Sequence, residues 1–285
     1  MGIESASYIS QLVDTNPVVG DPVGEGDDHL RLIKTVLQTQ FPNLTAGAVN
    51  TTQTEMNLLD GVTSLSSGAT NVNGLSDGLV EDNSIYIGND PSSSTSTAQY
   101  NVAVGTTALD AVTTGDGNVA IGHDALTAST TGLYNVAIGK DAMAVNTTGG
   151  YNAALGWRVL VANTTGSGNV GAGSSALRAN TTGGANTAYG NTAIYQNTTG
   201  SHNTGLGEGA LNYNTTADAN TATGYRSLYY NTTGASNTAM GWRAGDVITT
   251  GSNNVLLGTS ADPSANSASN QIVIGYGATG HGDNI

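Results

Sequence analysis

The phrase "NTTGGANTAYG" (residues 180–190) recurs with small changes through the second two-thirds of this 285-residue chain. It ends on a glycine of a series in which neighbouring members are always seventeen residues apart. The series consists of Gly88, Gly105, Gly122, Gly139, Gly156, Gly173, Gly190, Gly207, Gly224, Gly241, Gly258 and Gly275. Fixed self-similarity at this length is the signature of a solenoid, in which each copy stacks on the previous one.

Each glycine closes a short phrase with the alternation of a β-strand. In the phrase "NVAIG", Val119 and Ile121 share one face and Ala120 lies on the other, because successive strand side chains point to opposite faces. We expect the glycine to permit a tight corner, a second short strand around Ala125–Leu126, and "NTTG" to make the other corner. The repeat therefore predicts an all-β parallel β-solenoid (β-roll or β-helix) of about twelve 17-residue coils, with Val, Ile and Leu inside.

The small-residue face of this strand predicts association between chains. One coil buries few aliphatic side chains for the number of residues that it orders, so further contacts are needed. A row of Ala and Gly at the third strand position would let neighbouring backbones approach closely. We therefore expect a homotrimer around that face, and the candidates for its axis are Ala120, Ala137, Ala154 and Ala188.

Composition narrows the function classes. Charged residues are 10% of the chain, and the formal net charge is −14, so the basic surface of a nucleic-acid-binding protein is not expected. The chain has no cysteine, and its four histidines lack metal-ligand spacing, so we expect neither a metal nor a cofactor. The start of the chain does not read as a signal peptide, and no run reaches membrane-spanning length, so membrane insertion is not expected.

The residues before the repeats differ in character, and they suggest three regions: 1–62, a connector at 63–83, and a repeat shaft at 84–285. The stretch "DDHLRLIKTVLQTQFPN" (27–43) predicts one helix, and "TQTEMNLLDG" (52–61) predicts a second with a capping box. Neither helix can bury its apolar stripe alone. They either form a cap on the first edge of the solenoid or dock on a partner, through the candidate residues Leu30, Ile33, Leu37 and Phe41.

These residues carry a resemblance. The stretch that begins "YISQLVDTNPVVGDPVGEGDDHL", followed by "TTQTEMNLLDGVTS", resembles the amino-terminal region of bacteriophage tail fibres over about residues 7–64. In that family the region joins the fibre to the virion. The resemblance implies phage tail or baseplate proteins as partners, and a virion location after assembly in the host cytoplasm.

The repeats carry a second resemblance. "NVAIGHDAL" and "NTAMG" are similar to the head repeats of trimeric autotransporter adhesins, which form trimeric parallel β-rolls, although the seventeen-residue unit is longer than the usual adhesin repeat. Together the two resemblances imply a homotrimeric tail fibre that projects toward a host cell and contributes to adsorption.

Other functions were weighed against this one. A secreted trimeric adhesin would share the solenoid but requires a signal peptide and a membrane anchor, and an ice-binding solenoid would require flat threonine rows. A carbohydrate depolymerase requires paired carboxylates, and Asp124 and Asp141 would lie about 5 Å apart on neighbouring coils. With His123 and Lys140 alongside, a solvated ionic pair is the better interpretation, so we expect no catalytic or metal-binding residues.

The position after each glycine varies from copy to copy, which indicates that it faces solvent. Both tryptophans of the chain occupy it, and each is followed by arginine. Stacking of neighbouring coils would hold Tyr225 and Trp242 about 5 Å apart, near the spacing of an offset aromatic contact. Aromatic faces beside guanidinium groups suit sugar rings with anionic substituents. The alternative is that the rings cover aliphatic surface or pack between chains. The candidates for binding a host-surface glycan or protein are Trp157, Arg158, Tyr225, Arg226, Trp242 and Arg243.

Overall fold

The computed structural model describes residues 78–88, 91 and 96–282, which belong to one compact unit. The two predicted helices, with Leu30, Ile33, Leu37 and Phe41, lie outside the described residues. So does most of the predicted connector. No helix among the described residues is both long and apolar enough to cross a lipid bilayer.

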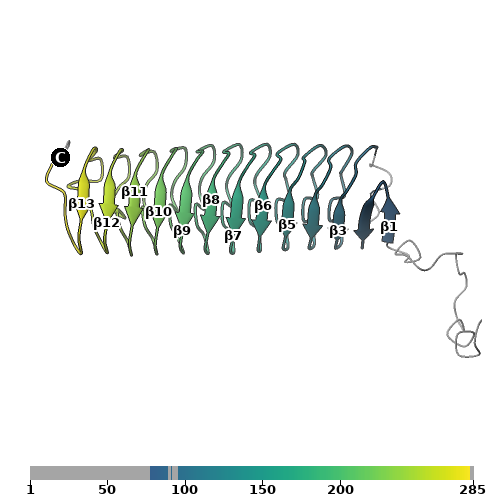
Figure 1. Cartoon of the computed structure of the whole chain (residues 1–285), viewed down its shortest axis with the longest axis horizontal. Coiled ribbons are helices and arrows are strands. Elements are labelled where there is room, and N and C mark those ends of the chain that lie inside the picture. Colours follow the sequence, from purple (N-terminus) through teal and green to yellow (C-terminus); the bar gives the residue numbers. More distant parts are fainter. Residues whose placement is uncertain (1–77, 89–90, 92–95, 283–285) are drawn as a thin grey trace, which may run out of the picture. The chain divides into compact units, whose positions relative to one another are not determined.

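The unit is a β-solenoid whose strands form one sheet in chain order (Figure 1). From β2 onward every neighbouring pair is parallel, and each residue pairs with the residue seventeen positions later, as Val119 does with Val136. The strands are β1 (Gly78–Glu81), β2 (Ser84–Ile87), β3 (Val102–Val104), β4 (Val119–Ile121), β5 (Val136–Ile138), β6 (Ala153–Leu155), β7 (Val170–Ala172), β8 (Thr187–Tyr189), β9 (Thr204–Leu206), β10 (Thr221–Thr223), β11 (Thr238–Met240), β12 (Val255–Leu257) and β13 (Ile272–Ile274). The predicted parallel solenoid is confirmed, with eleven complete turns between β2 and β13.

The first edge of the sheet is closed by a hairpin. β1 pairs with β2 in the antiparallel sense, and Asp82 and Asn83 form the connecting turn with φ angles of 44° and 61°. Two positive φ angles in a two-residue turn match the twist of the flanking strands. A stretch that the sequence placed in the connector therefore covers one side of β2, which would otherwise be an open edge.

The two faces of the strands are reversed relative to the sequence prediction. Ala120 is fully buried, whereas Ile121 is 38% exposed and Val119 is only partly buried. The same pattern recurs from turn to turn, so the small residues lie inside the chain and the larger aliphatic residues lie outside. The proposed trimer-axis residues are therefore misplaced, because their side chains lie within a single chain where no second chain can contact them. These residues are Ala120, Ala137, Ala154 and Ala188, each with 0% exposure.

Leucine from the opposite side of the coil explains this reversal. Leu126 is fully buried and faces the alanines of the strands, and its equivalents form a continuous column through the core. Large side chains on one side and small ones on the other fill the narrow interior without voids. Little room is left for Val or Ile of the strand, so they point outward. The column consists of Leu109, Leu126, Met143, Leu160, Leu177, Ile194, Leu211 and Leu228.

The predicted second strand around Ala125–Leu126 is absent, since a series of turns occupies this segment. Asp124 and Leu126 have φ angles of 58° and 53°, in the left-handed region. The segment still bonds to both neighbouring turns, because Asp124 donates its N–H to the Thr106 carbonyl at 3.2 Å and Leu126 donates to the Ala142 carbonyl at 3.0 Å. Left-handed residues thus shorten the return path while the backbone groups remain paired.

Two ladders of buried asparagines connect the turns. In the first, Asn186 Oδ1 accepts hydrogen bonds from the backbone N–H of Asn203 at 3.0 Å and from its Nδ2 at 3.2 Å. In the second, Asn197 Nδ2 donates to Asn180 Oδ1 at 2.7 Å. The two ladders meet at the Gly200 carbonyl, which accepts from Asn186 Nδ2 at 2.9 Å and from Asn197 Nδ2 at 2.8 Å. The interior polar groups therefore bond along the axis of the stack.

Glycine is required at the end of each strand because the backbones of neighbouring turns approach each other closely there. Gly122 has a φ angle of 131°, and a Cβ placed on it would lie 2.7 Å from the carbonyl carbon of Gly139 in the next turn. Only glycine fits both the backbone conformation and the spacing. The close contact between neighbouring turns therefore explains why glycine recurs every seventeen residues.

We expect Asn186→Ala to lower the free energy of unfolding by about 1–3 kcal/mol, because it leaves the buried N–H of Asn203 without its acceptor. The exposed Asn191 provides a matched control, and Asn191→Ala is expected to change stability by less than about 0.5 kcal/mol. Guanidinium denaturation followed by circular dichroism measures both. Equal effects of the two substitutions would contradict a structural role for the ladder.

Candidate functional site

Most residues of the row that follows the glycines are exposed, as the sequence predicted. Trp157 is 50% exposed, Trp242 is 48% exposed and Tyr276 is 89% exposed, whereas Tyr225 and Thr259 are partly buried. Each of these residues stands at the corner that follows a strand. The row therefore places side chains of several types at the same position of successive turns.

Tyr225 and Trp242 form the centre of an aromatic surface. Their rings stack with centroids 6.2 Å apart and an interplanar angle of 16°, which confirms the predicted contact between neighbouring turns. The guanidinium carbon of Arg226 lies 5.2 Å from the Tyr225 ring centroid, and that of Arg243 lies 5.2 Å from the Trp242 centroid. Four of the six predicted binding residues are thus brought together on two consecutive turns.

Three tyrosines that the sequence interpretation missed extend this surface. Tyr229 packs against Tyr230 with centroids 4.8 Å apart, and Tyr213 lies 5.2 Å from Tyr229 and 5.7 Å from Tyr230. Arg226 joins them to the predicted residues, since its guanidinium carbon lies 4.8 Å from the Tyr229 centroid. Burial, and next the neighbouring Tyr213, raise the pKa of Tyr229, so its hydroxyl stays protonated. The aromatic patch is defined as Tyr213, Tyr225, Arg226, Tyr229, Tyr230, Trp242 and Arg243.

The seventeen-residue spacing could have predicted part of this cluster. Tyr213 and Tyr230 are one repeat apart, so stacking places one directly above the other. Arg243 differs from Arg226 because its Nε forms an ion pair with Asp246 Oδ2 at 2.5 Å. Arg226, by contrast, contacts the rings of Tyr225 and Tyr229, and it has no ion pair among the residues that the structure describes.

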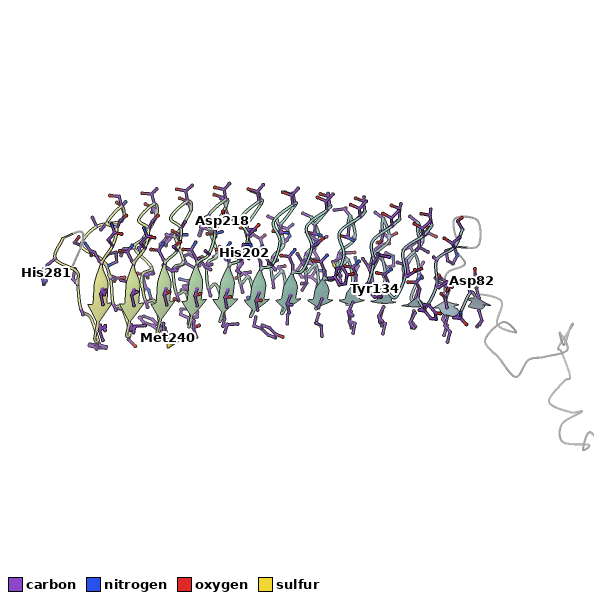
Figure 2. All side chains as sticks on the ribbon, turned by 45° about the horizontal axis from the view of Figure 1, so that its top comes forward. Asp82, Tyr134, His202, Asp218, Met240 and His281 are labelled. Carbon is purple, nitrogen blue, oxygen red and sulfur yellow. The ribbon has the colours of Figure 1, made fainter. Side chains whose placement is uncertain are left out.

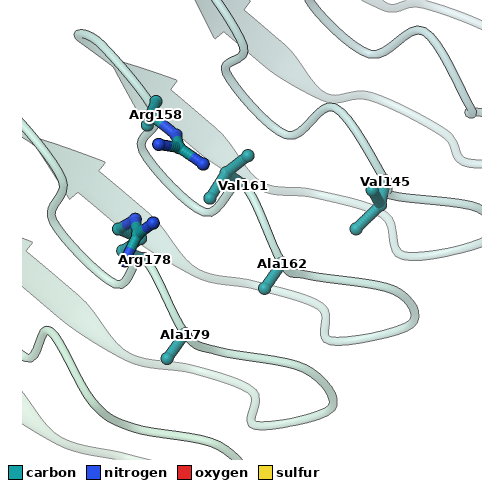
Figure 3. A pocket seen from close by; sticks show the side chains of 6 residues that line it. All are labelled: Val145, Arg158, Val161, Ala162, Arg178 and Ala179. Carbon is teal, nitrogen blue, oxygen red and sulfur yellow. The ribbon is translucent and has the colours of Figure 1, made fainter.

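Trp157 and Arg158 lie apart from the aromatic patch, four repeats before Tyr225 and Arg226. The guanidinium carbon of Arg158 lies 5.4 Å from the Trp157 ring centroid. A second pair that the sequence interpretation missed is close by, since Arg178 Nη1 donates to Tyr195 Oη at 2.5 Å. Between the two arginines the surface forms an open pocket of about 430 Å³ (Figure 3), lined by Val145, Arg158, Val161, Ala162, Arg178 and Ala179.

The carboxylates weighed as a catalytic pair are engaged in ion pairs. Asp141 bonds to Lys140 Nζ at 2.8 Å, and Asp124 Oδ2 lies 2.8 Å from His123 Nδ1. The other oxygen of Asp124 accepts a hydrogen bond from Thr107. His123, Asp124 and Asp141 each present an atom within 4.8 Å of the others. Both carboxylates are thus partly exposed, Asp141 beside a lysine and Asp124 beside a histidine.

The outer face of the strands is the other extended surface feature, and it is called the strand face here. It consists of the second and fourth side chains of each five-residue phrase that ends in the repeated glycine, such as Val119 and Ile121. None of these side chains is charged from β2 to β13. Met240 is 54% exposed and projects from this face (Figure 2), and Leu155 is 42% exposed. The large exposed members are Ile85, Val102, Val104, Ile121, Ile138, Leu155, Tyr189, Leu206, Met240, Ile272 and Ile274.

Comparisons of the chain with models of protein families, with curated proteins and with solved structures find no match.

One carboxylate beside the aromatic patch titrates in an accessible range. Burial, and next the negative charge of Asp246, raise the pKa of Asp262 from 3.8 to about 6. One carboxylate oxygen of Asp262 is buried without a hydrogen-bond partner. A raised pKa in the folded state means that ionisation of this carboxyl opposes folding. The cost is absent below pH 3.8, increases between pH 3.8 and 6, and is fully present above that range.

We therefore expect Asp262→Asn to raise the melting temperature at pH 7.5 and to raise it less at pH 4, because the amide cannot ionise. Differential scanning calorimetry of the wild-type and variant chains at both pH values measures the shift. An equal shift at the two pH values would show that Asp262 ionisation does not affect folding.

Proposed function

We propose that this protein is a homotrimeric bacteriophage tail fibre with a structural, non-enzymatic role. In this proposal the amino-terminal region attaches to the phage tail or baseplate through Leu30, Ile33, Leu37 and Phe41. The solenoid forms the shaft, which projects toward the host cell. The resemblance of residues 7–64 to tail fibres supports the virion location, and the uninterrupted solenoid supports the role of a spacer.

The exposed, uncharged strand face is the feature that best supports the proposed homotrimer. A long, uncharged row in which Val, Ile, Leu and Met predominate, with Thr at several positions from β8 to β11, is unusual on the surface of a monomer, and such surfaces mark interaction sites. A second copy in parallel, in-register orientation presents the same spacing along its whole length. The similarity of the repeats to adhesin heads favours three chains. The proposed interface therefore uses the strand face and not the buried alanines.

We expect light scattering to give three times the mass of one chain, and Ile138→Lys with Leu155→Lys to shift the protein to smaller species. The two positions are 38% and 42% exposed in a single chain, so the lysines are tolerated there but would be buried without a counter-charge in the trimer. Tyr151→Lys, at a position that is 65% exposed and is not one of the strand-face positions, is the control. A wild-type chain that is monomeric would refute the proposal.

The aromatic patch supports a role in host adsorption. Stacked rings beside guanidinium groups bind sugar rings and anionic groups, and no residue of the patch is a member of the strand face. We expect the patch to stay accessible in a trimer that buries the strand face. The same arrangement suits a host-surface glycan or an exposed protein loop.

We expect Tyr225→Ala with Trp242→Ala to reduce host adsorption at least tenfold, because both stacked rings at the centre of the patch are removed. Tyr276→Ala is the matched control, since it removes an exposed aromatic ring of the same row outside the patch. Adsorption rates of phage carrying each variant, with melting temperatures of the purified chains, give the comparison. Normal adsorption by the double variant would exclude the patch as a receptor site.

A further inference from the structure

The pocket between Arg158 and Arg178 has the features of a separate ligand site. The two arginines come from consecutive turns and lie at one end of the pocket, and Val145 lies at the other, with Val161 between them (Figure 3). Ala162 and Ala179 form a low floor because their side chains end at Cβ. The pocket thus combines two cations with an apolar base. Its Arg158 lies four repeats before Arg226 of the aromatic patch.

The charges of these arginines are not balanced by acids. Lys140 and Arg243 each form an ion pair with an aspartate, but none of the ion pairs among the described residues includes Arg158 or Arg178. Nε of Arg158 is buried and has no hydrogen-bond partner. Because protein encloses this nitrogen, an anion in the open pocket would bond to the other guanidinium nitrogens of Arg158.

Both side chains are held in place by aromatic rings. The Arg158 guanidinium carbon lies 5.4 Å from the Trp157 ring centroid, and that of Arg178 lies 5.4 Å from the Tyr195 centroid. Arg178 also donates a hydrogen bond to the Tyr195 hydroxyl. Side chains that are already positioned lose less conformational entropy when a ligand binds. The pair is therefore arranged for a small anion before any ligand arrives.

We infer that this pocket binds an acidic sugar that carries an acetyl group. The guanidinium groups of Arg158 and Arg178 take the carboxylate, because their planar donors match its two oxygens. The acetyl methyl group packs against Val145 and Val161, and the sugar ring covers the alanine floor. The volume of about 430 Å³ is within the range of pockets that hold one small ligand. The inference goes beyond the proposed function, since it does not require that the protein belongs to a virion.

The first test compares ligands on the purified full-length chain. The probe is a trisaccharide of N-acetylneuraminic acid, titrated by saturation-transfer nuclear magnetic resonance. Its acetyl methyl protons are expected to receive the strongest saturation. The carboxyl methyl ester lacks the negative charge. The analogue with a hydroxyl group in place of the acetamido group lacks the acetyl group without gaining a charged amine. Each is expected to bind at least tenfold more weakly. Equal binding of the acid and its ester would overturn the inference.

The second test changes the pocket. Arg158→Gln and Arg178→Gln are each expected to weaken binding of the trisaccharide at least tenfold, while Lys140→Gln, one turn away from Arg158 and outside the pocket lining, changes it less than twofold. Val145→Thr keeps the shape and is expected to weaken binding of the acetylated sugar only. If all three charge variants bind equally, attraction is non-specific and the pocket is not the site. The variant Tyr225→Ala with Trp242→Ala is expected to bind the trisaccharide as well as the wild-type chain does, whatever its effect on host adsorption. This result would support a site that is independent of the proposed function.

Discussion

The structure depends on the in-register stacking of turns that all have the same length. Each strand residue pairs with the residue seventeen positions later, and the buried asparagines repeat that register through their side chains. An insertion of one residue would remove a whole turn from both ladders and move its core residues to the surface. Glycine columns such as Gly122 and Gly139 hold neighbouring turns at close contact. Changes of side-chain volume are therefore best tolerated at positions that face outward, whereas the interior column holds residues of similar size, such as Leu126, Met143 and Ile194.

That constraint decides where function can lie. The interior positions are filled mainly by alanine, leucine and asparagine, so most of the chemical variety lies in the corner after each strand, the return segment and the strand face. The strand face is uniformly uncharged, which suits one long contact with identical chains. The corner and the return segment differ between turns, and there the stack collects Tyr225 with Trp242, and Arg158 with Arg178. A rigid repeat can thus carry several different local sites.

The sequence predicted the features that the period controls. The solenoid, the corner at Gly122, the exposure of Trp157 and Trp242 and the stacking of Tyr225 on Trp242 all follow from a fixed seventeen-residue spacing. The inward face was predicted wrongly, because hydrophobicity favours Val119 and Ile121 over Ala120 for the core. The deciding residue is Leu126, whose size leaves room only for alanine across the narrow interior.

Other features depend on conformations that residue type does not reveal. Leu126 has a left-handed backbone, which is rare for leucine, so the second strand was predicted where turns occur. Arg178 and Tyr195 were missed since neither belongs to the row after the glycines, although they are one repeat apart. A search of every repeat position for charged and aromatic residues would have found this pair, and also Tyr213 with Tyr230.

The most direct test of the account is electron microscopy of virions labelled with antibodies against the solenoid. Three parallel chains joined through their strand faces would form a thin, straight projection, which the amino-terminal region would fix to the tail. The account predicts that the label lies on fibres that extend from the tail. Label on the capsid or on the bacterial surface, with none on the tail, would contradict it.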